Sequence, residues 1–130
     1  MKFHELALQG VYWIDLEKKE DQRGFFARSF CEEELKGKGL VSHFPQCNIS
    51  FNALKGTLRG MHYSVDPASE VKMVRCTKGS VYDVVVDLRP GSPSYLHWIS
   101  IDLSSENRKI LYIPKGVAHG FQTLEDGCEL

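Results

Sequence analysis

The chain has 130 residues, of which 42% are hydrophobic and 25% charged, as expected for one globular domain with a single core. Sixteen basic and 17 acidic residues leave a formal net charge of -1, so the charge balance does not indicate a nucleic-acid partner. No stretch approaches the roughly 20 apolar residues that span a bilayer, and the amino terminus lacks a secretory signal; we therefore expect a cytoplasmic protein without a membrane partner.

Strand-like segments dominate the chain. Short runs rich in β-branched and aromatic residues, or alternating apolar with polar residues, predict strands when Gly, Pro, Asn or Asp bound them. By this criterion we expect strands at residues 11–16, 24–28, 47–52, 56–63, 71–77, 81–88, 95–103, 109–113 and 118–124. Lys78 and Gly79 predict a hairpin turn.

The run from Val81 to Leu88 shows the alternation most clearly. Its even-numbered residues share one face of an extended strand, and Asp83, Val85 and Asp87 share the other. Valine occurs on both faces, whereas the carboxylates are confined to one. This pattern is typical of a half-buried strand or a barrel strand.

One short, peripheral helix is expected. Ser29 and Glu32 have the spacing of a capping box, and the helix would run through Leu35 and stop at Gly37 and Gly39. About eight or more short strands without alternating helices predict an all-β fold, either an antiparallel jelly roll or a related double-sheet barrel.

Two segments, 58–63 and 113–121, each place a histidine close to a glycine within a strand-like run. Such glycines allow a ligand or another strand to approach closely, so His62 and His119 predict a lined cavity. His62 follows Arg59 by three residues, which puts the two on opposite faces unless a bulge intervenes, and Gly60 is a plausible bulge residue. For either histidine alone, a hydrogen-bonded core position is the alternative.

The segment from Pro114 to His119 has the Pro-x-Gly-x-x-His form of cupin barrels, which often hold a metal ion with three histidines and a glutamate. His62 is followed by no second histidine in a His-x-His pair, and Glu70 is offset. Two imidazoles alone make a poor metal site, so we predict no bound metal. The four cysteines lack a CxxC spacing, and we expect reduced, mostly buried thiols.

Several blocks occur in the order and spacing of one known family. They are residues 21–26, 46–50, 58–63, 72–75, 79–89 and 113–121. Together they resemble the dTDP-4-dehydrorhamnose 3,5-epimerase family. The resemblance implies a single cupin domain over residues 1–130, a homodimer, and no cofactor. It also implies a substrate, dTDP-4-dehydro-6-deoxyglucose, whose C3 and C5 are inverted by proton transfer beside the C4 ketone.

The same resemblance implies roles for individual residues. His62 would be the base, as a histidine can be near neutral pH, and Lys72 would stabilise the negative charge that develops on the ketone oxygen. The substrate-binding residues would be two arginines suited to the diphosphate, three polar lining residues and one apolar wall, namely Arg23, Arg59, Gln46, Asn48, His119 and Phe26.

Departures from the family pattern leave alternatives open. Arg28, Ser64 and Glu70 replace residues that are commonly Glu, Gln and Gln.

Family members also carry a further stretch with a proton-donating tyrosine and an aspartate that orients the base. Because Cys128 begins a new strand after a turn at Gly127, we expect a truncated chain that lacks a C-terminal strand and helical region, or a naturally short relative whose missing strand comes from elsewhere. A sugar 3,4-ketoisomerase and a non-catalytic sugar-nucleotide binding cupin are the alternative functions.

Overall fold

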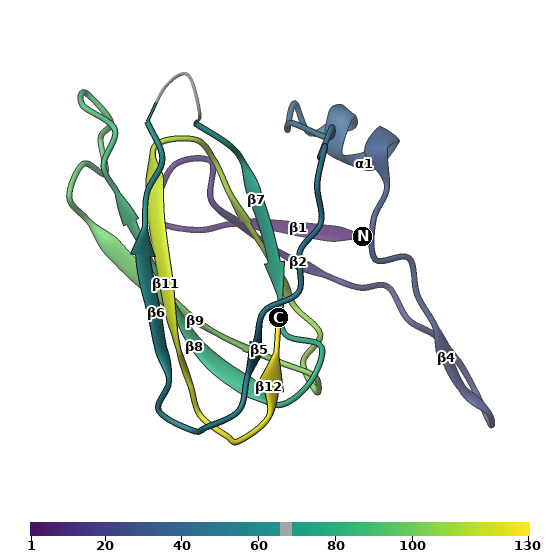
Figure 1. The fold of residues 1–130 in the computed structure, drawn as a ribbon. Coiled ribbons are helices and arrows are strands. Elements are labelled where there is room, and N and C mark those ends of the chain that lie inside the picture. The colour runs from purple at the N-terminus through teal and green to yellow at the C-terminus, as the bar shows by residue number, and fades with distance from the viewer. Residues whose placement is uncertain (66–68) are drawn as a thin grey trace.

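Two four-stranded antiparallel sheets pack face to face and form a jelly roll (Figure 1). The computed structural model describes residues 1–65 and 69–130. The first sheet has the order β1 (Lys2–Glu5), β2 (Tyr12–Asp15), β10 (Ile110–Ile113) and β7 (Lys72–Arg75). The second sheet has the order β6 (Leu58–His62), β11 (Val117–Thr123), β8 (Ser80–Asp87) and β9 (Trp98–Ser104).

Strand β10 separates two hydrophobic clusters. Leu111 and Ile113 point into the main core between the sheets, where they meet residues of β8, β9 and β11. Ile110 and Tyr112 point outward and pack with Leu35 of the helix α1 (Glu32–Gly37). All four residues of β10 are buried, so alternate side chains of this strand face either the inter-sheet space or the outer cluster.

Two smaller strand pairs complete the fold. Strand β5 (Phe51–Asn52) pairs with β12 (Cys128–Glu129) at one end of the sandwich, and β3 (Lys19–Asp21) with β4 (Gly24–Phe26) forms a hairpin that extends away from both sheets (Figure 1). No helix in the described residues is long and apolar enough to cross a membrane.

Each predicted strand segment overlaps an observed strand, but two local predictions are wrong. Lys78 and Gly79 do not form a hairpin turn, because β7 and β8 lie in different sheets and Lys78 instead bridges Glu129. The capping box at Ser29 is not used: the helix begins at Glu32 after Cys31, whose side chain makes no capping bond. The chain stays extended at Cys31 and turns only where Leu35 can be buried.

The expected burial of the cysteines holds for two of the four. Cys76 and Cys128 are buried in the main core, Cys31 is half-buried and Cys47 is exposed. Burial raises the pKa of Cys76 to about 11, which makes this thiol a poor nucleophile.

Candidate active site

Strands β6 and β11 carry polar side chains on the face of the second sheet that is turned toward the first sheet. We call the group formed there by His62, His119, Arg59 and Lys72 the cup. His62 lies directly opposite His119, and Arg59 lies opposite Phe121; opposed residues of an antiparallel pair project to the same face. The rings of His62 and His119 are 6.0 Å apart, and Phe121 belongs to the main core. Both His62 and Arg59 therefore face the space between the sheets.

A β-bulge at Gly60, the position that the sequence left open as a plausible bulge, places His62 and Arg59 on the same face. The strand register shifts between His119 and Phe121, so residues three apart on β6 project to one side. Gly60 has a φ of +106°, and a Cβ there would lie 2.6 Å from the Gly120 Cα. Glycine is thus required at the bulge for its backbone conformation and for the close approach of β11.

Lys72 reaches the same space from the other sheet. It is paired with Ile113, whose side chain lies in the main core, so Lys72 also projects between the sheets. The side chain is 25% exposed, and its Nζ lies 3.6 Å from Glu70. His62 ends β6 and Lys72 begins β7, so the two residues flank one connection at the same end of the sandwich.

Arg59 is held by a buried amide that sequence reasoning missed. Its Nε donates a hydrogen bond of 2.6 Å to Asn52 Oδ1, and Asn52 is only 2% exposed. The Asn52 amide in turn donates to the Ser50 carbonyl at 3.2 Å. The terminal guanidinium nitrogens have no partner among the described residues, so they can donate to a phosphate group.

His119 contacts a second unpredicted residue, Asp83 on the inner face of β8. Its Nδ1 lies 3.3 Å from Oδ2 and 3.4 Å from Oδ1 of that carboxylate. Burial raises the pKa of Asp83, and the contact with His119 offsets this only in part. The alternation of the run from Val81 placed Asp83 on the same face as Val85 but did not show which histidine lay beside it.

Gln46 lies beside Glu70, next to Lys72, whereas the Asn48 side chain makes no hydrogen bond among the described residues. Gln46 Nε2 donates to Glu70 Oε2 at 3.4 Å, and Glu70 also neighbours Lys72. Asn48 is exposed on the segment that leads to β5. The predicted strand over residues 47–52 is formed only at its last two residues.

Arg23 and Phe26 lie outside the cup of their own chain. Arg23 is at the tip of the β3–β4 hairpin, 84% exposed and paired with Asp21 at 2.7 Å. Phe26 is 74% exposed. Because the hairpin extends away from both sheets (Figure 1), these two predicted substrate contacts are not brought together with His62 within one protomer.

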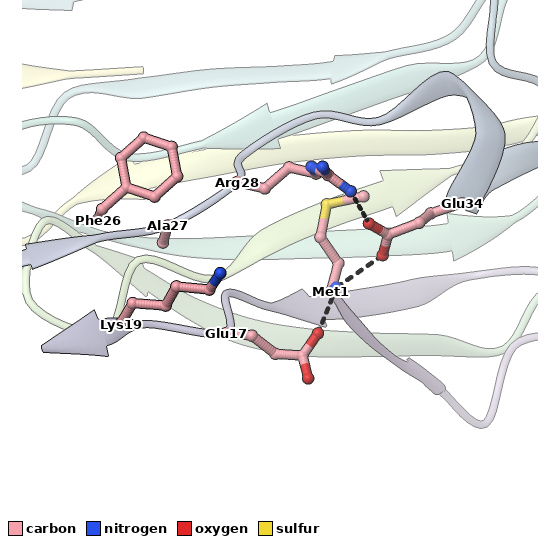
Figure 2. A pocket seen from close by; sticks show the side chains of 7 residues that line it. All are labelled: Met1, Glu17, Lys19, Phe26, Ala27, Arg28 and Glu34. Atoms are coloured by element: carbon pink, nitrogen blue, oxygen red, sulfur yellow. Dashed lines mark hydrogen bonds and ion pairs between the residues drawn. The ribbon is translucent and has the colours of Figure 1, made fainter.

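Phe26 lines a separate hollow beside the helix (Figure 2). The ammonium group of Met1 contacts Glu17 at 2.6 Å and Glu34 at 2.7 Å there, and Arg28 contacts Glu34 at 2.8 Å. None of the cup residues lines this hollow. Its carboxylates are already paired with cations of the same chain, so it does not share the chemistry of the cup.

The cup combines the groups needed to move a proton next to a carbonyl. An imidazole can take a proton, a cation can stabilise an oxyanion, and a guanidinium can bind a phosphate. Within residues 1–65 and 69–130, no three His, Cys, Asp or Glu side chains gather as a metal site would require. The absence of a bound metal stays a prediction.

A family model described as dTDP-4-dehydrorhamnose 3,5-epimerase matches residues 5–130. A relative of the same description from Sinorhizobium fredii is 42% identical over 125 residues, which cover 96% of this chain and 64% of that protein. The chain thus spans less than two thirds of that relative's length.

Solved structures are similar over nearly the whole chain. The Bacillus anthracis dTDP-4-dehydrorhamnose 3,5-epimerase with TDP and PPi bound has a TM-score of 0.94 at 36% identity, covering 98% of this chain and 73% of that one. A Legionella pneumophila 3,5-epimerase in complex with dTDP-4-keto-L-rhamnose has a TM-score of 0.89 at 36% identity, covering 98% and 68%. These likenesses confirm the predicted jelly-roll fold.

Proposed function

The chain belongs to the dTDP-4-dehydrorhamnose 3,5-epimerase family, and we propose that it inverts C3 and C5 of dTDP-4-dehydro-6-deoxyglucose. The observation that carries the proposal is the placement of His62 and Lys72, which face one cup from two different sheets. The Legionella relative binds dTDP-4-keto-L-rhamnose, which supports a dTDP-linked keto-sugar as the substrate here.

In this proposal His62 removes the proton from a carbon next to the C4 ketone. The C–H electrons then form the enolate, whose negative charge rests on the ketone oxygen. Lys72 stabilises that charge, and its side chain is sheltered enough for the attraction to be stronger than in bulk water. A proton returned to the opposite face inverts the carbon. The family resemblance assigns this donor to a tyrosine outside residues 1–130.

The diphosphate would bind at Arg59. Asn52 holds the Nε edge of the guanidinium, so the remaining edge is directed for paired hydrogen bonds to phosphate oxygens. The Bacillus relative was crystallised with TDP and PPi bound, which supports a ligand that contains a diphosphate here. Gln46 and Asn48 would add polar contacts at the mouth of the cup.

We propose that two copies of the chain form a homodimer in which each β3–β4 hairpin reaches the partner's cup. This arrangement accounts for the placement of Arg23 and Phe26 on an exposed hairpin. The outer face of the second sheet also exposes Leu58 and Trp98, by 72% and 61%, and such apolar surface is typical of an interface.

A complementation experiment tests the shared site. Arg23→Ala and His62→Ala proteins should each be inactive or weak, and a mixture allowed to exchange protomers should regain part of the activity. In a mixed dimer, one cup receives an intact His62 from one protomer and an intact Arg23 from the other. A mixture no more active than its components, with subunit exchange verified, would exclude the shared site.

Incubation with dTDP-4-dehydro-6-deoxyglucose in deuterated water tests the reaction. Deuterium at both C3 and C5 of an inverted sugar is the expected result. Migration of the carbonyl would identify a sugar 3,4-ketoisomerase instead. Binding of the nucleotide-sugar without exchange at either carbon would identify a non-catalytic binding cupin.

A further inference from the structure

We infer that Asp83 is a positioning residue, which accepts the Nδ1–H of His119 and so fixes that imidazole with Nε2 presented to the cup beside His62. The inference deepens the proposed function, because it assigns His119 a hydrogen-bonding task toward the sugar. Asp83 itself does not reach the substrate.

The register of the second sheet brings the pair together. Asp83 is opposite Phe121 on β11 and opposite Ile101 on β9, and its side chain lies on the inner face, 0% exposed. His119 is two residues from Phe121 on the same face. Its Nδ1 lies almost equally far from the two carboxylate oxygens, at 3.3 and 3.4 Å, so one N–H can be shared between them.

The surroundings of Asp83 give it no other side-chain partner in the described part of the chain. Val81 and Val85 flank it on the inner face, and both belong to the apolar core. Burying a carboxylate among such neighbours is costly unless it is hydrogen-bonded or paired, and burial does raise the pKa of Asp83. Among residues 1–65 and 69–130, the contact with His119 is therefore the only side-chain interaction that compensates this cost.

The other ring nitrogen of His119 remains accessible. Nε2 has no hydrogen-bond partner among the described residues, and no side-chain nitrogen or oxygen there is buried without a partner. Nε2 must therefore touch solvent, which places it at the cup surface, and the centroids of the His119 and His62 rings are 6.0 Å apart. With Nδ1 protonated toward Asp83, a neutral His119 presents a lone pair at Nε2. It would accept a hydrogen bond from a sugar hydroxyl.

Substitution of the carboxylate by an amide separates this role from a purely structural one. Asp83→Asn keeps the shape of the side chain, but its amide can donate to Nδ1 and favour the opposite tautomer, as in the aspartate-to-asparagine variant of a serine protease triad. We expect kcat/KM for the dTDP-sugar to fall about ten- to a hundredfold, by analogy with the loss when the hydrogen-bond partner of a metal-ligating histidine is removed. The melting temperature should not fall.

Nitrogen-15 NMR of the histidine rings reads the tautomer directly. In the unmodified protein, His119 should carry its proton on Nδ1. Asp83→Asn should move that proton at least partly to Nε2, whereas the control Asp87→Asn should leave the signal unchanged. This readout needs no substrate, so it remains decisive even if deuterium exchange shows that the proposed epimerisation is absent.

Two results would overturn the inference. One is a neutral His119 with its proton on Nε2 in the unmodified protein, a measurement that does not depend on any variant folding. The other is an Asp83→Asn protein whose His119 tautomer and kcat/KM both match those of the unmodified chain.

Discussion

Two aspartates on the inner face of β8 are equally buried but differ in their partners. Asp83 and Asp87 are each 0% exposed. Asp83 contacts one histidine at 3.3 Å or more, whereas Asp87 accepts short side-chain hydrogen bonds, of 2.5 to 2.8 Å, from Arg89, Ser92 and Ser94.

The pKa values of the two carboxyls move in opposite directions for this reason. Burial alone would raise both. At Asp87 the hydrogen bonds from Arg89, Ser92 and Ser94 outweigh burial and hold the pKa below its ordinary value. At Asp83 burial prevails and the pKa is raised. A buried carboxylate with several donors stabilises its own ionised form, whereas one with a single weak partner does not.

The difference in partners indicates that Asp87 stabilises the fold, whereas Asp83 belongs to the candidate site. Arg89 also donates to the Gln9 carbonyl at 2.7 Å, so the Asp87 cluster ties the β8–β9 connection to the turn between β1 and β2. In the part of the chain that the structure describes, the Asp83 side chain contacts only His119, which faces the cup. We therefore expect the Asp87 side to govern stability and the Asp83 side to govern turnover.

The largest effect is expected on the cup side, from Lys72→Met. Removal of the cation that faces the ketone oxygen should lower kcat about 10²- to 10³-fold, or ~2.7–4 kcal/mol, because an apolar side chain cannot stabilise the enolate. Initial rates of product formation measure this. Lys55→Met, at an exposed lysine without an ion pair in the described structure, serves as the control. An unchanged kcat for Lys72→Met would remove Lys72 from the mechanism.

The next effect concerns stability and contrasts the two aspartates directly. Asp87→Asn should lower the free energy of unfolding by about 2 kcal/mol, since hydrogen bonds to a charged group are weakened, while kcat of the folded protein is retained. Asp83→Asn should not lower it, since a poorly compensated buried charge is removed. Urea unfolding of both variants at pH 7 measures the difference. A larger loss of stability for Asp83→Asn than for Asp87→Asn would contradict the contrast between the two carboxylates.

The smallest effect is in the pH dependence of stability. Because the folded pKa of Asp87 is depressed, its stabilisation is present above the unfolded pKa of about 3.9 and is lost as pH falls through the lower folded pKa. In the Asp87→Asn protein, the free energy of unfolding should therefore fall less steeply as the pH is lowered below about 4.

For Asp83 the sign is opposite. Its folded pKa is raised, so its ionisation destabilises the fold above that pKa, and the penalty disappears as pH falls toward the unfolded pKa. Any gain in stability from Asp83→Asn should accordingly shrink between pH 7 and about pH 4. A gain that grows on acidification would contradict the assignment. Urea titrations across this range measure both variants.

The features that could be predicted from the sequence are those set by residues close together along the chain, such as strand positions and strand faces. Period-two alternation located β8, and the sequence offered Gly60 as a plausible bulge residue that would bring Arg59 and His62 to one face. The Lys78–Gly79 turn was misassigned because turn chemistry is local, whereas the sheet that the next strand joins is decided by distant partners.

The same limit applies to the site. His62, Lys72, Arg59 and His119 were predicted and do face one cup, because their strand positions determine their faces. Asp83 was missed as a partner because its contact with His119 spans 36 positions of sequence. The placement of Arg23 on an outward hairpin likewise depends on how that hairpin leaves the sheets, which no local pattern specified.

The most direct test of the proton-transfer cup is deuterium incorporation by His62→Ala. Measured beside the unmodified protein and the exposed-histidine control His97→Ala, it should show no deuterium at C3 or C5 of the dTDP-sugar while the affinity for dTDP is kept. The unmodified protein and the control should both incorporate deuterium at these carbons. Equal incorporation by His62→Ala and the unmodified protein would contradict the role of His62 as the base.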